Sequence, residues 1–304
     1  MAGVTGTSQI DQAVRKFVAE SRYTLQERSG VSRMGMRVET LPENQGPSVN
    51  IPKYGTINTY ALTEGVDMTQ AQQITDTAMT ITPTEYGAQV VLTDMNLMES
   101  KAEFRAVARR ILRDSFNRQQ DQVLCDDFAS FSIDNGTAAG VLNVGEIMAA
   151  HASIKYNAPA NGTAGRGGEP APDPTFGFFT PAQIHALNKT LTGGQGAAAA
   201  TQITPEMERA VGKIGGSFSI PGLPGLMIAS TININKDASD DAIGTVKSKE
   251  AHILVELGGG PDIEPERDAS LRAWEFNIVG RWARGEYSDA WGRAMTFDSA
   301  LPTG

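Results

Sequence analysis

The sequence lacks the residues from which disulfide frameworks and structural zinc sites are built. Among 304 residues there is one cysteine, Cys125, and there are three histidines, His151, His185 and His252. A single cysteine excludes an intrachain disulfide, and histidines this far apart do not have the spacing of zinc ligands. We therefore expect no structural zinc, and we expect Cys125 to be a small buried hydrophobic residue.

Long apolar runs and an excess of positive charge are missing as well. No apolar run reaches the roughly 18 residues of a membrane-spanning helix, and the N-terminus lacks a basic region followed by an apolar one. We therefore expect neither a membrane span nor a signal peptide, and a protein that is made in the cytosol. The 35 acidic against 26 basic residues give a net charge of −9. An acidic chain gains no affinity by neutralising phosphates, so we do not expect direct binding of nucleic acid, although a protein that encloses nucleic acid without binding it is still compatible with this charge.

Motifs of catalysis and cofactor binding are also absent. There is no nucleophile elbow and no phosphate-binding loop. Residues 194–199 match G-x-G-x-x-A, but they follow a predicted helix instead of a strand. Asn233, Asn235 and Asp237 begin a calcium-loop pattern that fails at its sixth and twelfth positions, which predicts a turn. We predict no catalytic residue, no cofactor and no metal site.

One acidic run leaves an alternative open. It consists of Asp262, Glu264, Glu266 and Asp268. We expect it to be an exposed strand edge or loop. The rival interpretation is a cation site, which would make the chain a metal-dependent enzyme.

The most informative segment is an uninterrupted helical pattern at 100–131. Apolar residues recur at helical spacing from Phe104 to Phe131, with no Gly or Pro between them. Ser100 and Glu103 form a capping box at the start. A helix of this length would extend about 45 Å, which is long for a globular chain. Its polar face carries Arg105, Arg109, Arg110, Arg113 and Arg118. Such a face is either solvated and ion-paired within the helix or in contact with an acidic partner surface.

The segments before this helix predict an arm and an extended hairpin. Residues 8–28 have a loose helical pattern, which fits a helix docked on its own core or an arm that packs on a neighbour. Residues 36–99 have strand-like alternation with many Thr and Gln. Because residues 63–78 are too polar to be buried on both faces, we expect a hairpin that reaches away from the core.

A mixed α/β region is predicted at 140–304. The patterns indicate helices at 144–155, 181–191 and 205–214, and strands at 175–180, 226–233, 251–257 and 271–284. Segments rich in Gly, Pro or Ala at 157–174 and 193–200 predict exposed, flexible loops.

This order of elements resembles the major capsid proteins of tailed bacteriophages, whose fold is named after the Hong Kong coliphage. Residues 49–52 (VNIP) and the Glu64-Gly65 step resemble the family's extended loop, and 82–100 resembles its passage into the spine helix. The IPGLPGLMI segment at 220–228 is similar to the Gly/Pro step into a central strand of the axial domain. Residues 284–287 and 294–297 resemble the closing strand pair of the peripheral domain.

The resemblance implies an α+β subunit with four parts. They are an N-terminal arm at 1–35, an extended β-hairpin loop at 36–82, a peripheral domain at 83–139 and 262–304 with its spine helix at 100–131, and an α/β axial domain at 140–261. It also implies that the extended loop bridges to a neighbouring subunit, and the arginine face of the helix at 100–131 is a second candidate contact surface. The residues expected to make these contacts are Tyr60, Leu62, Glu64, Ile74, Arg109 and Arg113.

The function implied by the resemblance is structural and non-enzymatic. The chain would self-assemble as hexamers and pentamers into an icosahedral shell that encloses double-stranded DNA without specific binding, in a virion assembled in the host cytoplasm. Expected partners are a portal, decoration proteins and a separate scaffolding protein, because about 35 residues before the extended loop are too few for a built-in scaffold. No membrane is involved. The alternative within the same fold is the shell of an encapsulin-type protein compartment.

Overall fold

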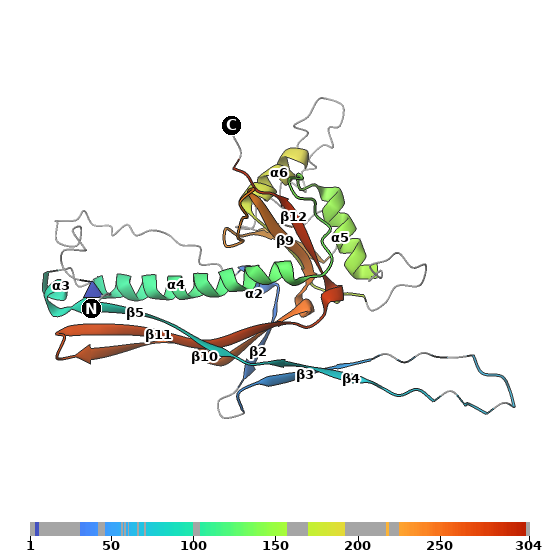
Figure 1. Ribbon diagram of the computed structural model, residues 1–304, viewed down its shortest axis with the longest axis horizontal. Helices are drawn as coiled ribbons and strands as arrows, with labels where there is room; N and C mark the ends of the chain where they lie inside the picture. The colour runs from blue at the N-terminus through green and yellow to red at the C-terminus, as the bar shows by residue number, and fades with distance from the viewer. Residues whose placement is uncertain are drawn as a thin grey trace.

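A computed structural model of the chain shows an elongated body, a second lobe and a projecting hairpin (Figure 1). The residues that the structure describes are 4–5, 31–41, 46–55, 57, 59, 61–65, 67–69, 71–99, 104–156, 170–191, 217–218 and 225–301. The helices predicted at 8–28 and 205–214, the loop at 193–200, most of the loop at 157–174 and the capping box at 100–103 lie outside these residues.

The helices are dominated by one long member. They are α2 (Val31–Met34), α3 (Asp94–Glu99), α4 (Phe104–Asp126), α5 (Val144–Tyr156) and α6 (Pro181–Leu191), with 3-10 turns η2 (Asp127–Ser130), η3 (Lys249–Ala251) and η4 (Asp289–Trp291). Among the described residues, no helix is both long and apolar enough to cross a membrane.

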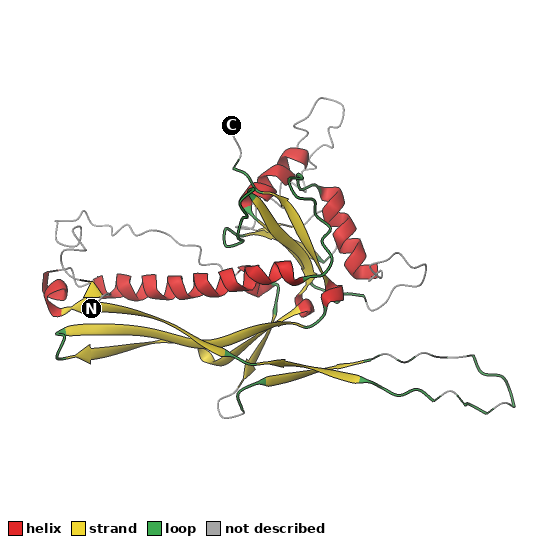
Figure 2. Ribbon diagram, in the orientation of Figure 1, coloured by secondary structure: helices red, strands yellow, loops and turns green. Residues whose placement is uncertain are grey.

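A long, twisted five-stranded sheet forms the elongated body together with α4 (Figure 2). Its order is β1 (Val4–Thr5), β5 (Thr84–Thr93), β11 (Ala273–Glu286), β10 (His252–Asp268) and β2 (Arg37–Leu41). β5, β11 and β10 are antiparallel to one another, and β1 and β2 join the two edges as parallel strands. Helix α4 lies along this sheet. Its buried Leu112 and Phe116 share a core with Leu92, Phe276 and Ile278 of the strands.

The second lobe is built on another five-stranded sheet. Its order is β12 (Gly292–Asp298), β9 (Asp241–Ser248), β6 (Thr175–Phe179), β8 (Leu226–Ser230) and β7 (Ser217–Phe218). Helices α5 and α6 pack against it through Ile147, Ile154 and Leu187. Every residue of β6 is buried, as expected for a central strand covered on both faces.

The hairpin consists of β3 (Val49–Tyr54) and β4 (Asp76–Ile81), which pair antiparallel in register from Val49–Ile81 to Tyr54–Asp76. Its base packs on the first sheet. Ile81 is buried with Ile253 and Val255 of β10, and Met79 lies against this cluster. Beyond Tyr54 the hairpin leaves the body (Figure 1).

Four predicted features need correction. Within the described part of the helix expected at 100–131, the α-helix covers Phe104–Asp126, about 35 Å, and the chain continues as the 3-10 turn η2 instead of as α-helix. The segment at 36–99 is not strand throughout, because it ends in helix α3. Strand β2, expected in the extended loop, pairs with β10 in the first sheet. Residues 294–297, expected beside 284–287 in the peripheral domain, form β12 of the second sheet.

The two sheets are joined at the C-terminal end of α4. The carboxylate of Asp121, which is buried, accepts hydrogen bonds from the Ser32 amide at 3.2 Å and from the Asn233 side chain at 2.7 Å, so α4, α2 and the second lobe meet there. Two turns further on, the ring of Phe128 stacks on that of Phe178 in β6 at 5.4 Å. The joint is therefore both polar and apolar.

A fully buried lysine lies in this joint. The Lys247 ammonium is 5.3 Å from the Phe128 ring centre and 6.0 Å from that of Phe178, and Nζ lies 3.3 Å from Nδ1 of His252. Burial lowers the pKa of Lys247 to about 7, although the carboxylate of Asp127 opposes the shift. Burial, Lys247 and Arg284 lower the pKa of His252 as well, so this imidazole is neutral.

We predict that Lys247→Met changes how stability depends on pH. Lys247 titrates near 10.5 when exposed and near 7 in the folded protein, so the folded state binds fewer protons between these values. The contribution of Lys247 to the free energy of unfolding therefore rises with pH from 7 towards 10.5, and it is lost as pH falls through 7. Methionine has no such dependence. In denaturant unfolding, the stability of the variant relative to wild type should be highest at pH 6 and decline by pH 10.

The matched control is Lys189→Met, because Lys189 is exposed on α6. Its stability relative to wild type should stay constant over the same range. A relative stability of Lys247→Met that is equally flat would show that Lys247 is not deprotonated on burial.

Candidate inter-subunit surfaces

The distal part of the hairpin exposes apolar side chains. Leu62, Met68 and Ile74 are 66%, 69% and 63% exposed. Glu64 lies in the turn at the tip and is exposed too, whereas Tyr60 lies outside the described residues. Near the base of this part, the Gly55 amide donates to the Thr75 carbonyl at 2.7 Å. A two-stranded segment of this kind is only marginally stable in water, so a covering surface would stabilise it.

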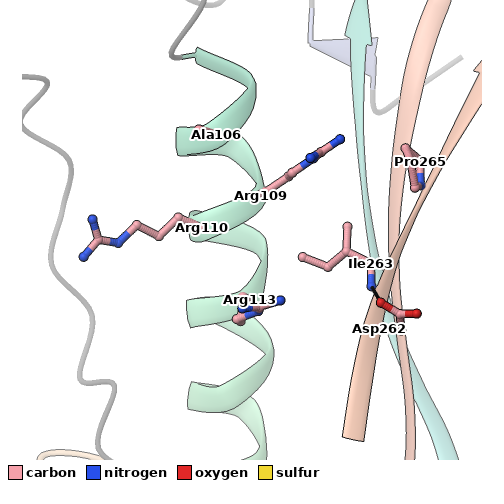
Figure 3. A pocket seen from close by; sticks show the side chains of 7 residues that line it. All are labelled: Ala106, Arg109, Arg110, Arg113, Asp262, Ile263 and Pro265. Carbon is pink, nitrogen blue, oxygen red and sulfur yellow. Dashed lines mark hydrogen bonds between the residues drawn. The ribbon is translucent and has the colours of Figure 1, made fainter. Parts of the chain in front are cut away.

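A groove runs between α4 and β10 in the first sheet (Figure 3). It has a volume of about 550 Å³ and is lined by Ala106, Arg109, Arg110, Arg113, Asp262, Ile263 and Pro265. Arg109 points from the helix towards the strands, and Arg110 points away from them (Figure 3). The guanidinium of Arg109 lies 4.9 Å from the Phe276 ring centre. Arg109 and Arg113 are both exposed, so the groove presents positive charge to solvent.

The hairpin and the groove carry opposite charge. Beyond Lys53, residues 54–81 of the hairpin contain Glu64, Asp67 and Asp76 and no Lys or Arg. The exposed face of α4 has arginines at 105, 109, 110, 113 and 118. The two predicted contact regions lie at different ends of the molecule (Figure 1), so one subunit does not bring them together.

The acidic run at 262–268 forms part of β10. Asp262 to Asp268 pair with Val279 to Ala273 of β11, while β2 pairs only with Ile253 to Leu257. The run is therefore a strand edge, as expected. No cluster of three or more metal-ligating side chains occurs among the described residues. The Asn233 segment is a turn, and Cys125 is buried, both as predicted.

Ser130 and His252 lie together but do not form a catalytic pair. Ser130 Oγ is 3.4 Å from Nε2 of His252, and it donates to Glu286 at 2.8 Å. In a Ser-His-Asp triad the other ring nitrogen of the histidine donates to a carboxylate, whereas here that nitrogen faces Nζ of Lys247, and the serine proton is directed to Glu286. The arrangement therefore holds the joint together and gives the serine no activated hydroxyl.

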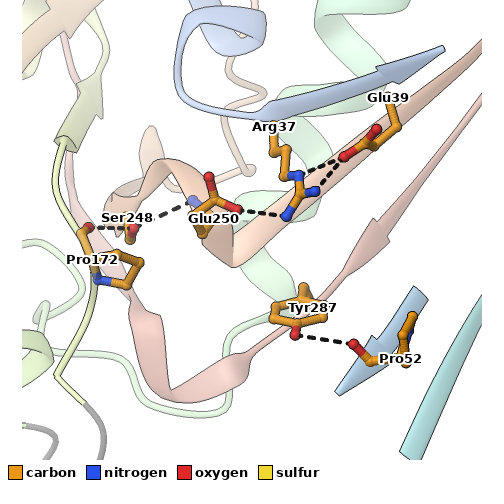
Figure 4. Close-up of polar contacts among 7 residues, drawn as sticks. All are labelled: Arg37, Glu39, Pro52, Pro172, Ser248, Glu250 and Tyr287. Atoms are coloured by element: carbon orange, nitrogen blue, oxygen red, sulfur yellow. Dashed lines mark hydrogen bonds and ion pairs between the residues drawn. The ribbon is translucent and has the colours of Figure 1, made fainter. Parts of the chain in front are cut away.

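Sequence reasoning missed a cluster of contacts where the hairpin meets the two sheets. The Tyr287 hydroxyl donates to the Pro52 carbonyl of β3 at 3.5 Å, and Arg37 bridges Glu39 and Glu250 (Figure 4). Lys53 of β3 lies over the aromatic rings of the turn between β11 and β12. Two aromatic residues in a short polar turn, Tyr287 and Trp291, were the only signal in the sequence.

This architecture defines a class of fold. A long helix lies along a twisted sheet, a hairpin projects from the base of that sheet, and a second α/β lobe joins at the end of the helix. The chain therefore has the fold of the major capsid proteins of tailed bacteriophages, the Hong Kong coliphage-type fold.

Solved structures from three phages illustrate the likeness. The capsid of Ralstonia phage GP4 is similar with a TM-score of 0.71 and 14% identity over 100% of both chains. The head structure of Helicobacter pylori bacteriophage KHP40 is similar with a TM-score of 0.68 and 9% identity, over 97% of this chain and 98% of the phage chain. The capsid of cyanophage P-SCSP1u is similar with a TM-score of 0.65 and 14% identity, over 97% of this chain and 96% of the phage chain. No protein-family model and no curated protein matches the sequence.

We predict that charge reversal at Arg109 and Arg113 leaves the subunit folded. Both side chains are exposed, and the contact of Arg109 with Phe276 is worth about 0.5–1 kcal/mol at such a site. Arg109→Glu should therefore lower the free energy of unfolding by about 1 kcal/mol and Arg113→Glu by less, with unchanged helicity in circular dichroism. Arg284→Glu is the contrasting variant, because Arg284 is half-buried and pairs with Asp127 at 2.5 Å. A loss at Arg113 as large as that at Arg284 would show that the exposed face supports the fold.

Proposed function

We propose that this chain is a major capsid protein that assembles as hexamers and pentamers into an icosahedral shell around double-stranded DNA. The observation that carries the proposal is the likeness to the Ralstonia phage GP4 capsid over 100% of both chains. The net charge of −9 suits a wall that encloses DNA and does not bind it specifically.

The exposed hairpin supports an assembly role. Its distal residues must lose backbone entropy of about 1–2 kcal/mol each on ordering, and their apolar side chains are not buried within the subunit. Laid on a neighbouring subunit, Leu62 and Ile74 lose contact with water and the backbone gains a packed surface. We infer that the hairpin is a bridge between subunits.

The groove on α4 is the surface that we assign to the receiving subunit. Its arginines complement the acidic hairpin, and its apolar floor at Ile263 and Pro265 suits the tip's apolar side chains. Exposed ion pairs each contribute at most about 1 kcal/mol, but one such contact is repeated for every subunit of a shell. Glu64 of one copy therefore faces Arg109 and Arg113 of the next.

Further partners follow from the proposed role. A shell that is filled with DNA needs an entrance, which a portal provides. We also propose a separate scaffolding protein during assembly and decoration proteins on the finished shell. The particle is the virion, and assembly takes place in the host cytoplasm.

Replacing residues 63–76 with a short Gly/Ser turn should give a folded subunit that forms no stable shells. The removed segment is exposed, so thermal unfolding should change little, while closed particles should disappear from negative-stain images and light scattering. The milder variant Leu62→Ser with Ile74→Ser should reduce particle yield in the same direction, because it removes only the apolar contacts. Thr63→Ser with Thr69→Ser is the matched control and should assemble normally.

Hydrogen exchange gives the same test without a mutation. Amides at 57–75 should exchange freely in subunits and slowly in particles. Equal protection in both states would mean that the hairpin is ordered by its own subunit, and the bridging role would have to be abandoned.

Charge reversal should separate the two sides of the contact. Glu64→Arg with Asp67→Arg, and Arg109→Glu with Arg113→Glu, should each assemble poorly because like charges then meet. All four changes together restore attraction and should recover shells. At about 1 M salt, where the Debye length is about 3 Å, the differences should shrink. A combined variant as defective as each pair alone would place the acidic hairpin on another surface.

A further inference from the structure

Lys53 links the hairpin to both sheets at once. It is half-buried on β3, and its Nζ lies 5.7 Å from the ring centre of Tyr287 and 5.6 Å from that of Trp291. The same Nζ is 3.4 Å from Oγ of Ser288. These three partners belong to the segment that leaves β11 in the first sheet and enters β12 in the second. One ammonium group therefore touches the point where all three parts of the molecule meet.

The other contacts of the hairpin base are mostly apolar and therefore less directional. Ile81 and Met79 lie against Gly285, where an added Cβ would come within 2.9 Å of Ile81 Cδ1. Such packing holds the base down but allows it to tilt, because burial depends on area more than on angle. The Lys53 ammonium over the rings of Tyr287 and Trp291 restricts the direction of the hairpin, because the attraction requires the ammonium to stay above the ring faces. The Tyr287 hydroxyl adds a hydrogen bond to Pro52, the residue next to Lys53 (Figure 4).

The position of Lys53 gives it leverage over the tip. It is the last but one residue of β3, and the exposed part of the hairpin begins after Tyr54. Residues 55–65 span up to roughly 35 Å when extended, so a tilt of about 10° at the base moves the tip by about 6 Å. That displacement exceeds the 4 Å reach of an ion pair. The sequence has no other Lys or Arg between Arg37 and Lys101, so no other basic side chain of this segment could replace it.

We propose that Lys53 is a positioning residue, which holds the hairpin at a set angle to the body and so determines where its tip meets the neighbouring subunit. The second half of this statement rests on the proposed capsid function, whereas the first half concerns a single subunit.

The experiment measures the hairpin angle in free subunits by the distance between two spin labels. One label is attached at Asp76→Cys, at the distal end of the paired strands β3 and β4, and the other at the exposed position Val141→Cys, in a Cys125→Ala background. Wild-type Lys53 should give a narrow distance distribution, and Lys53→Met a broader or displaced one. Lys53→Arg should keep the narrow distribution, because a guanidinium also stacks on aromatic rings. Tyr287→Leu removes a ring from the other side and should reproduce the effect of Lys53→Met, whereas Tyr287→Phe keeps the ring and should not.

Circular dichroism and thermal unfolding show whether each variant is folded, and the Tyr287 pair gives the answer if Lys53→Met does not fold. Superimposable distributions for wild type, Lys53→Met and Tyr287→Leu would overturn the proposal and leave the apolar cluster as the sole determinant of the angle. Because the subunits are unassembled, this outcome is independent of shell formation. A further readout follows in particles, where closed shells should become fewer in Lys53→Met and recover in Lys53→Arg.

Discussion

The structure depends on one helix that is buried in two cores. Along most of α4 the apolar face covers the first sheet, but near its end Leu124 is buried with the first core and Cys125, the next residue, with the second. Phe128 in η2 then stacks on β6. Because consecutive residues of a rigid helix face different sheets, the two lobes cannot rotate independently. The direction of α4 therefore sets the geometry of the whole subunit.

Local patterns predicted much of the fold. Helix α6 has the predicted bounds of 181–191, and α5, β6, β8 and β11 differ by a few residues at their ends. These elements have a clear period or a fully buried run. The C-terminal limit of α4 was wrong because the apolar spacing continues through η2, where the backbone tightens without any change in pattern. The projecting hairpin was predictable because its polarity left it no core to enter.

The sequence did not predict which strands pair when they lie far apart along the chain. β12 follows β11 in the chain but joins the other sheet beside β9, and nothing in the residues at 292–298 distinguishes the two choices. β9 was not predicted because it is buried, like a core strand, yet it contains Gly244 and Lys247. The candidate contact residues came from the resemblance of the extended loop, from its few apolar side chains and from the arginine face of the long helix, all of which a sequence reveals. The contact of Lys53 with the turn at 287–291 could not be predicted from the sequence, because it requires residues 235 positions apart to meet.

The place of β12 also has a consequence for synthesis. The first sheet needs β10 and β11, and the second needs β12, so the first is incomplete until residue 286 has left the ribosome and the second until residue 298 has. Contacts of such long sequence separation slow folding, because distant segments must be brought together before they contribute stability. The hairpin is made early, but its anchor at Gly285 and Tyr287 is made late. A growing chain therefore carries an unanchored hairpin, and only a finished subunit presents it in the geometry that its neighbours need.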